Sequence, residues 1–228
     1  MRTAAILPVK RFGAAKQRLG RSVPDELRLR LARAMVADVL EALERTSALE
    51  LTILVTGQED LARVARGKGA EVLEDGSDSG QSAAVLRGSR HALALGFERV
   101  LCVPGDCPAL DPDELSALLA ASSSGQLVIV PDRHGSGTNG LLLAPPDAIE
   151  PSFGPDSFER HRSAAAAAGL EIRVERPASL LLDIDTGEDL HELRARLHTA
   201  SPHARRTREV LAEAPAGESA AHARDASP

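Results

Sequence analysis

Short runs of apolar residues, rich in Val, Ile and Leu, recur along the chain and have the length of buried β-strands. A strand covered on both faces gives a continuous apolar run, whereas a half-exposed strand alternates apolar and polar positions. Most of these runs are continuous, so the pattern predicts a sheet buried on both sides. The predicted strands are Thr3–Val9, Leu51–Thr56, Ala70–Leu73, Arg99–Val103, Leu127–Val130 and Leu141–Ala144.

Most of the intervals between these strands carry the apolar spacing of helices. The clearest one has apolar side chains at every fourth position from Leu27 to Leu43, which places them on one helix face. Strand and helix in alternation favour an α/β fold with a mostly parallel sheet, in which ligands bind beyond the carboxyl ends of the strands. The predicted helices here are Pro24–Arg45, Ser82–Leu95 and Pro112–Ala121.

The second half departs from simple alternation. The glycine-rich loop between residues 130 and 141 is too short for a crossover helix, which predicts an antiparallel pair and a mixed sheet. Thr186 and Asp189 have the spacing of a reciprocal helix cap. Residues 1–198 are therefore predicted to form one domain, and residues 199–228, which lack an apolar period, a flexible C-terminal tail. Further predictions are a helix over Ser157–Ala168, an extended segment over Glu171–Val174, an apolar run over Ser179–Leu182 and a helix over Gly187–Leu197.

Composition narrows the function classes. With 43% hydrophobic and 26% charged residues, the 228-residue chain is typical of a globular protein. The absence of Trp and Tyr and the net charge of −6 disfavour nucleic-acid binding, which usually needs a basic surface with stacking aromatics. Cys102 and Cys107 have no metal-ligand or disulfide spacing, so we expect thiols. No signal-peptide or membrane-spanning pattern is present, and the expected location is the cytoplasm.

A basic segment follows the first predicted strand. Lys10, Arg11, Lys16 and Arg18 place four cations within nine residues. At the carboxyl end of a strand, they could neutralise a triphosphate, although a solvated basic loop has the same composition. Neither a P-loop nor a dinucleotide-binding glycine pattern occurs, which argues against an ATPase of that type and against a dehydrogenase.

Acidic residues follow two other apolar runs. Asp106 lies in a Gly- and Pro-rich turn after the fourth predicted strand, and Asp183 and Asp185 follow the run that ends at residue 182. Residues two apart on an extended chain face the same side, so Asp183 and Asp185 could share a hard cation such as Mg²⁺ with Asp106. The alternative is that these are turn residues without a ligand.

Two further segments could hold an anion. Glycines at positions 135, 137 and 140 would let the backbone approach a ligand, while Thr138 and Asn139 offer hydrogen bonds. Residues 153–157 open a helix, where backbone amides and a capping Ser157 could bind a negative group. A plain hairpin turn and an ordinary capped helix are the alternatives. His134 is the one histidine near a motif, and no histidine is assigned a catalytic role.

Together, these segments resemble the phospholactate/phosphoenolpyruvate guanylyltransferase family of coenzyme F-420 (deazaflavin) biosynthesis. The resemblance spans residues 3–195 with the motifs in the family's order, and it implies a single-domain Rossmann-like nucleotidyltransferase fold of the GT-A type. The motifs are Leu7–Lys10 with Ala15–Leu19, Pro104–Pro108, Pro131–Asn139 and Asp183–Thr186.

The resemblance also implies roles for individual residues. Asp106, Asp183 and Asp185 would bind Mg²⁺, with Asp106 and Lys16 as the catalytic pair. Gln81 and Ser82 stand near the nucleotide, where Leu and Asn are usual in the family. The remaining implied contacts are Lys10, Lys16 and Arg18 with the triphosphate, and Thr138, Gly154 and Ser157 with a three-carbon acid.

The implied reaction is transfer of GMP from GTP to phosphoenolpyruvate with release of pyrophosphate, and the product could pass to the next enzyme of the pathway. Abundant Ala and Arg indicate a GC-rich genome, and phosphoenolpyruvate is the choice for an actinobacterial-like member. Alternative acids are 2-phospho-L-lactate and 3-phospho-D-glycerate. Alternative proteins are a molybdenum-cofactor or sugar-phosphate nucleotidyltransferase, and a non-catalytic nucleotide-binding regulatory protein.

Overall fold

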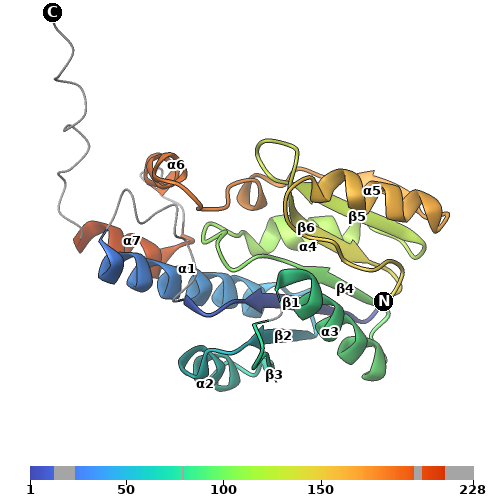
Figure 1. Cartoon of the computed structure of the whole chain (residues 1–228), viewed down its shortest axis with the longest axis horizontal. Coiled ribbons are helices and arrows are strands. Elements are labelled where there is room, and N and C mark those ends of the chain that lie inside the picture. The colour runs from blue at the N-terminus through green and yellow to red at the C-terminus, as the bar shows by residue number, and fades with distance from the viewer. Residues whose placement is uncertain (13–23, 79, 198–201, 214–228) are drawn as a thin grey trace, which may run out of the picture.

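A seven-stranded sheet forms the centre of the molecule, in the order β3-β2-β1-β4-β6-β5-β7 (Figure 1). The computed structural model describes residues 1–12, 24–78, 80–197 and 202–213. Its strands are β1 (Thr3–Val9), β2 (Leu51–Thr56), β3 (Glu71–Glu74), β4 (Arg99–Cys102), β5 (Gln126–Pro131), β6 (Thr138–Leu143) and β7 (Glu171–Val174).

Strand β6 determines where the polar residues of the glycine-rich loop lie. It runs antiparallel to both neighbours, β4 and β5, whereas the other pairs of neighbouring strands are parallel. The first residues of β6, Thr138 and Asn139, therefore lie at the edge of the sheet where the other strands end. This confirms the predicted mixed sheet and its antiparallel pair.

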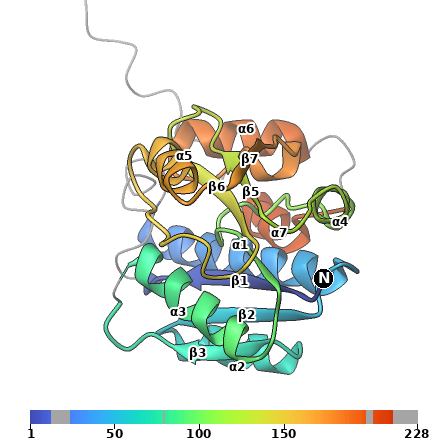
Figure 2. The same cartoon turned by 90° about the vertical axis from the view of Figure 1, so that its right-hand side faces the viewer.

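Alternate residues of each central strand enter separate hydrophobic cores on the two faces of the sheet. In β1, Ala5 and Leu7 belong to one core and Ala4 and Ile6 to the other. Helices cover both faces, and Figure 2 shows α4 and α5 on opposite sides of the sheet. The first core packs against α1 (Asp25–Arg45), α2 (Glu59–Gly67), α4 (Pro112–Ala120), α6 (Gly187–Leu197) and α7 (Arg205–Glu213), and the second against α3 (Gln81–Ala94) and α5 (Ser157–Ala167).

Helix α7 corrects one prediction. The flexible tail predicted from residue 199 is wrong for residues 205–213, which form α7 and pack against α1. The buried Asp38 of α1 accepts hydrogen bonds from the backbone amides of Arg206 at 3.1 Å and Thr207 at 2.8 Å. A cap from a residue far away in the chain therefore stabilises this helix. No local apolar pattern in the sequence predicts the helix. Residues 199–201 and 214–228 of the predicted tail lie outside the described residues.

Cys102 and Cys107 are buried and form no disulfide, as predicted, and the Cys107 thiol contacts the Leu180 carbonyl oxygen at 3.8 Å. Among the described residues, no helix combines the length and apolar character required to cross a membrane.

Candidate active site

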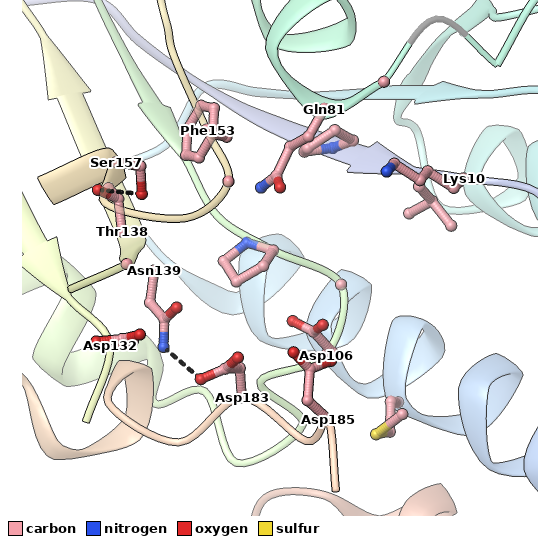
Figure 3. Close-up of a pocket in the computed structure, with 18 of the residues that line it drawn as sticks. Lys10, Gln81, Asp106, Asp132, Thr138, Asn139, Phe153, Ser157, Asp183 and Asp185 are labelled. Carbon is pink, nitrogen blue, oxygen red and sulfur yellow. Dashed lines mark hydrogen bonds between the residues drawn. The ribbon is translucent and has the colours of Figure 1, made fainter. Parts of the chain in front are cut away.

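A cleft of about 820 Å³ opens at the carboxyl ends of the parallel strands. Residues that follow β1 and β4 line it, together with the start of β6, the loop before α5 and the segment before α6. Figure 3 shows that its polar side chains gather in separate groups rather than mixing. The cleft therefore offers distinct chemical environments to different parts of a ligand.

Three carboxylates form one side of the cleft, which we name the acidic wall: Asp106, Asp183 and Asp185 (Figure 3). Asp106 follows β4, whereas the other two follow the short 3₁₀ helix η3 (Ala178–Leu180). The backbone amide of Ile184 donates to the Asp106 carbonyl oxygen at 3.1 Å, which joins the two segments directly. The structure thus brings together the three residues that the sequence predicted as a set.

The surroundings of Asp183 disfavour the charged form of its carboxyl group. Burial raises the pKa of its carboxyl group, and the nearby charges of Asp106 and Asp185 raise it further. The side-chain amide of Asn139 opposes this by donating to Asp183 Oδ1 at 3.0 Å, and it also donates to the Leu180 carbonyl oxygen at 2.8 Å. Asn139 therefore holds the acidic wall in place, a role that the sequence did not reveal.

The acidic wall fits one kind of metal site better than another. Within residues 1–12, 24–78, 80–197 and 202–213, no three His, Cys, Asp or Glu side chains form a ready-made metal-binding group. An all-protein cage, as for structural zinc, is therefore not supported in this part of the chain. Mg²⁺ is usually bound through one or two carboxylates together with substrate phosphates, and hard carboxylate oxygens beside an open cleft suit that arrangement.

The start of α6 supports the acidic wall from behind. Asp189 Oδ2 accepts hydrogen bonds from the backbone amides of Asp185 at 3.0 Å and Thr186 at 2.7 Å. The Asp189 amide in turn donates to Thr186 Oγ1 at 3.2 Å, which confirms the predicted reciprocal cap. Arg133 reaches the other oxygen of Asp189 at 2.7 Å, so the glycine-rich loop is tied to the same helix end.

A second side of the cleft, which we name the hydroxyl wall, consists of Thr138 and Ser157 (Figure 3). Ser157 Oγ donates to Thr138 Oγ1 at 3.2 Å. The prediction that Ser157 caps α5 is wrong, because Asp156 is the N-cap residue and the Ser157 hydroxyl is used across the cleft wall. Its actual partner still leaves it facing the space where a ligand would lie.

His161 lies directly behind the hydroxyl wall and was missed by sequence reasoning. Its side chain is fully buried, with Nδ1 3.0 Å from Thr138 Oγ1 and Nε2 accepting from the backbone amide of Ser152 at 2.9 Å. Burial, aided by the charge of Arg160, lowers its pKa to about 4, so the ring is neutral at pH 7. One signal was available: position 161 is four residues after Ser157 and shares its helix face.

The loop before α5 shapes the end of the hydroxyl wall. Gly154 has φ +111°, a conformation that side-chain-bearing residues rarely adopt, and it lines the cleft. Arg160 fixes the loop by donating to the hydroxyl and carbonyl oxygens of Ser152 and to the carbonyl oxygens of Phe153 and Pro155. The predicted contact residue Gly154 is therefore held in the cleft by its own loop.

Two of the three glycines predicted to let the backbone approach a ligand are packed against side chains of the protein itself. A Cβ at Gly137 would lie 2.7 Å from Asp132 Oδ2, and one at Gly140 would lie 3.0 Å from the Val130 side chain. Gly137 and Gly140 therefore make room for the protein's own side chains, whereas a Cβ at Gly135 would meet nothing within 4 Å.

The predicted nucleotide-binding residues separate into three groups. Lys10 and Gln81 line the cleft (Figure 3). Ser82 has a contact within the protein instead, since its hydroxyl accepts a hydrogen bond from the Phe153 amide at 2.8 Å and so ties α3 to the loop before α5. Lys16 and Arg18 lie outside the described residues.

Comparison with known proteins decides the family. The model of the family described as guanylyl transferase CofC like matches residues 3–213. The chain belongs to this family. A phosphoenolpyruvate guanylyltransferase from Conexibacter woesei is 47% identical over 213 residues, which cover 92% of this chain and 96% of the relative. A 2-phospho-L-lactate guanylyltransferase from Methanothermobacter thermautotrophicus is 36% identical over 90% of this chain and 89% of its own.

Solved structures agree on the fold. A nucleotidyl transferase from Methanothermobacter superposes with a TM-score of 0.67 at 20% identity, covering 87% of this chain and 99% of the other. The predicted family and the predicted nucleotidyltransferase fold are thus both confirmed.

Proposed function

We propose that this protein is a magnesium-dependent phosphoenolpyruvate guanylyltransferase, which transfers GMP from GTP to phosphoenolpyruvate and releases pyrophosphate. The observation that carries this proposal is one cleft bounded by the acidic wall and the hydroxyl wall, in a chain 47% identical to a relative of that name. A wall of carboxylates suits a cation-bound triphosphate, and neutral hydroxyl donors suit the anionic acid. By the same resemblance, the product would enter deazaflavin biosynthesis.

The reaction is an in-line displacement at phosphorus. A phosphate oxygen of the acid forms a bond to the α-phosphorus of GTP, while the bond from that phosphorus to the β-phosphate oxygen breaks and pyrophosphate leaves. This nucleophile is already ionised at neutral pH, so no protein base has to remove a proton. Catalysis would then depend on positioning and on neutralising charge.

Each wall would serve one substrate. Lys10 and Gln81 would contact the nucleotide, and Lys16 and Arg18 are proposed to hold its triphosphate. Thr138, Ser157 and the Gly154 loop would hold the acid. Asp106, Asp183 and Asp185 would hold Mg²⁺, which when bound neutralises phosphate charge and makes the α-phosphorus easier to attack.

The proposal is tested by measuring pyrophosphate release from GTP, Mg²⁺ and each of phosphoenolpyruvate, 2-phospho-L-lactate and 3-phospho-D-glycerate. Mass spectrometry should identify the GMP adduct of phosphoenolpyruvate. No release with any of the three acids would remove the proposal and leave the non-catalytic nucleotide-binding protein as the better reading.

The relative named 2-phospho-L-lactate guanylyltransferase favours that acid as the second candidate. The two acids have the same carbon skeleton, and the third carbon is a methylene group in one and a methyl group in the other. Apolar differences of about this size are discriminated by only about 1–3 kcal/mol. Competition between them in one reaction, with both products quantified, therefore decides the preference better than separate assays.

A further inference from the structure

We propose that His161 is a positioning residue which keeps the Thr138 hydroxyl oriented as a hydrogen-bond donor toward the anionic acid substrate. This inference rests on the proposed function and adds a residue that does not touch the substrate itself. It follows from three hydrogen bonds that run from the loop before α5, through the imidazole ring, to the surface of the cleft.

The hydrogen bond from Ser152 fixes the tautomer of the His161 ring. The backbone amide of Ser152 has only a hydrogen to offer, so His161 Nε2 must accept and carries no proton. A neutral imidazole then bears its single proton on Nδ1. Nδ1 lies 3.0 Å from Thr138 Oγ1, and the His161 ring therefore donates to the Thr138 oxygen.

The tautomer of His161 decides where the hydroxyl hydrogens of the hydroxyl wall can point. Thr138 and Ser157 together carry two, and one of them lies in the bond between the two hydroxyl groups, 3.2 Å long. Because the Nδ1 proton occupies the space between Thr138 and His161, the second hydroxyl hydrogen cannot point there. It is left for the cleft, which both residues line.

An anionic ligand needs this outward-pointing hydroxyl hydrogen. A carboxylate or phosphate accepts hydrogen bonds and offers none, so the hydroxyl wall binds it only while a hydroxyl hydrogen is directed outward. With the opposite tautomer, Thr138 would donate to Nδ1, and its oxygen lone pairs would face the anion. The Ser152 amide, fixed in a loop that Arg160 also braces, prevents this reversal.

Two substitutions separate the hydrogen bond that His161 donates to Thr138 from the one that it accepts from the Ser152 amide. In His161→Gln, the side-chain carbonyl oxygen can reach the Nε2 position and accept from Ser152, but no group donates to Thr138. In His161→Asn, the side-chain amide nitrogen occupies the Nδ1 position and can donate to Thr138, but the Ser152 amide loses its acceptor. We expect KM for phosphoenolpyruvate to rise about tenfold in His161→Gln, the value of one hydrogen bond to a charged group. In His161→Asn, this KM should remain within about threefold of wild type.

The turnover number and KM for GTP should change less than about twofold in His161→Gln, because the nucleotide lies against other residues. A double variant tests whether His161 acts through the Thr138 hydroxyl. If it does, adding His161→Gln to Thr138→Val should raise KM for the acid by less than about twofold, because the hydroxyl group is already absent. His91→Gln, at a helix residue paired with Glu71, is the matched control and should behave as wild type.

Equal losses in His161→Gln and His161→Asn, or full additivity with Thr138→Val, would show a merely structural histidine and overturn the inference. Calorimetric binding of phosphoenolpyruvate in the absence of GTP gives the same comparison without turnover. If wild type binds the acid but releases no pyrophosphate, the proposed function fails while the role of His161 is still decided. Unchanged acid affinity in a folded His161→Gln variant would remove the inference alone.

Discussion

On the acidic wall, burial and two nearby carboxylates raise the pKa of Asp183, whereas on the hydroxyl wall Thr138 lies between two groups that bond to it. The first wall brings like charges together, and the second pairs donors with acceptors. The hydroxyl wall is therefore already oriented before a ligand binds, with one hydroxyl hydrogen left for the cleft, while the charge repulsion in the acidic wall is relieved when a cation binds. One substrate would meet a surface already organised for it, and the other would bring part of its own site.

The largest expected effect comes from the acidic wall. Asp106→Asn keeps the size of the side chain but removes the charge, so turnover should fall by about 10²–10³-fold, as when one preorganised electrostatic contact is lost. Pyrophosphate release under saturating substrates measures this. Asp113→Asn, at an exposed position of α4, is the control and should retain wild-type turnover. Unchanged turnover in a folded Asp106→Asn variant would remove the metal-site proposal.

The hydroxyl wall should instead make the unfolding free energy of the protein depend on pH. The pKa of His161 is lowered from 6.5 to about 4 in the folded protein, so the unfolded chain binds this proton first as pH falls. The contribution of the neutral ring to stability is complete above pH 6.5 and is lost progressively between pH 6.5 and 4. The loss should approach about 3 kcal/mol.

Chemical denaturation of wild type and His161→Gln across this pH range isolates the effect. The difference in unfolding free energy between them should shift against wild type as pH falls. A constant difference from pH 7 to pH 4 would mean that His161 does not titrate as the buried ring should.

A smaller effect on activity is expected from Asn139, which follows Thr138 of the hydroxyl wall and bonds to Asp183 of the acidic wall. Asn139→Ala removes the amide that orients Asp183, and residues that orient metal ligands typically change metal affinity by about 10–100-fold. The Mg²⁺ concentration for half-maximal activity should rise accordingly, while KM for the acid changes little. A large rise in KM for the acid with unchanged Mg²⁺ dependence would assign Asn139 to the hydroxyl wall instead.

The smallest effect on function lies outside both walls. Asp38→Ala removes the cap of α7 and should lower the unfolding free energy by about 1–2 kcal/mol. Both KM values should remain unchanged at a temperature where the variant is folded. A specific loss of turnover would imply that α7 supports the cleft as well as the fold.

The sequence predicted what depends on local pattern. The bounds of β1 and β2 agree with the prediction, because buried strands read as unbroken apolar runs. The short helix α2 was missed, since only Leu61, Ala62 and Ala65 are buried along its nine residues. Helix α7 was missed because its cap comes from a residue far away in the chain.

The residues of the candidate site also divide into those that a local sequence pattern predicts and those that depend on distant contacts. Asp106, Asp183 and Asp185 could be found because acidic residues after apolar runs form a visible pattern. His161 could not be assigned a role, because its function depends on Ser152 and Thr138, which reach it only in the folded structure. Asn139 was noticed as a hydrogen-bonding residue, but its true partners, Leu180 and Asp183, lie about forty residues further along.

The cap between Asp38 and α7 also sets an order of events during synthesis. The carboxylate and the amide of Arg206 are 168 residues apart, and translation at about 5–20 residues per second separates their appearance by roughly 8–34 seconds. During that interval, helix α1 exists without the segment that covers its buried charge. The nascent protein should therefore gain its full resistance to proteolysis only after residue 213 has left the ribosome.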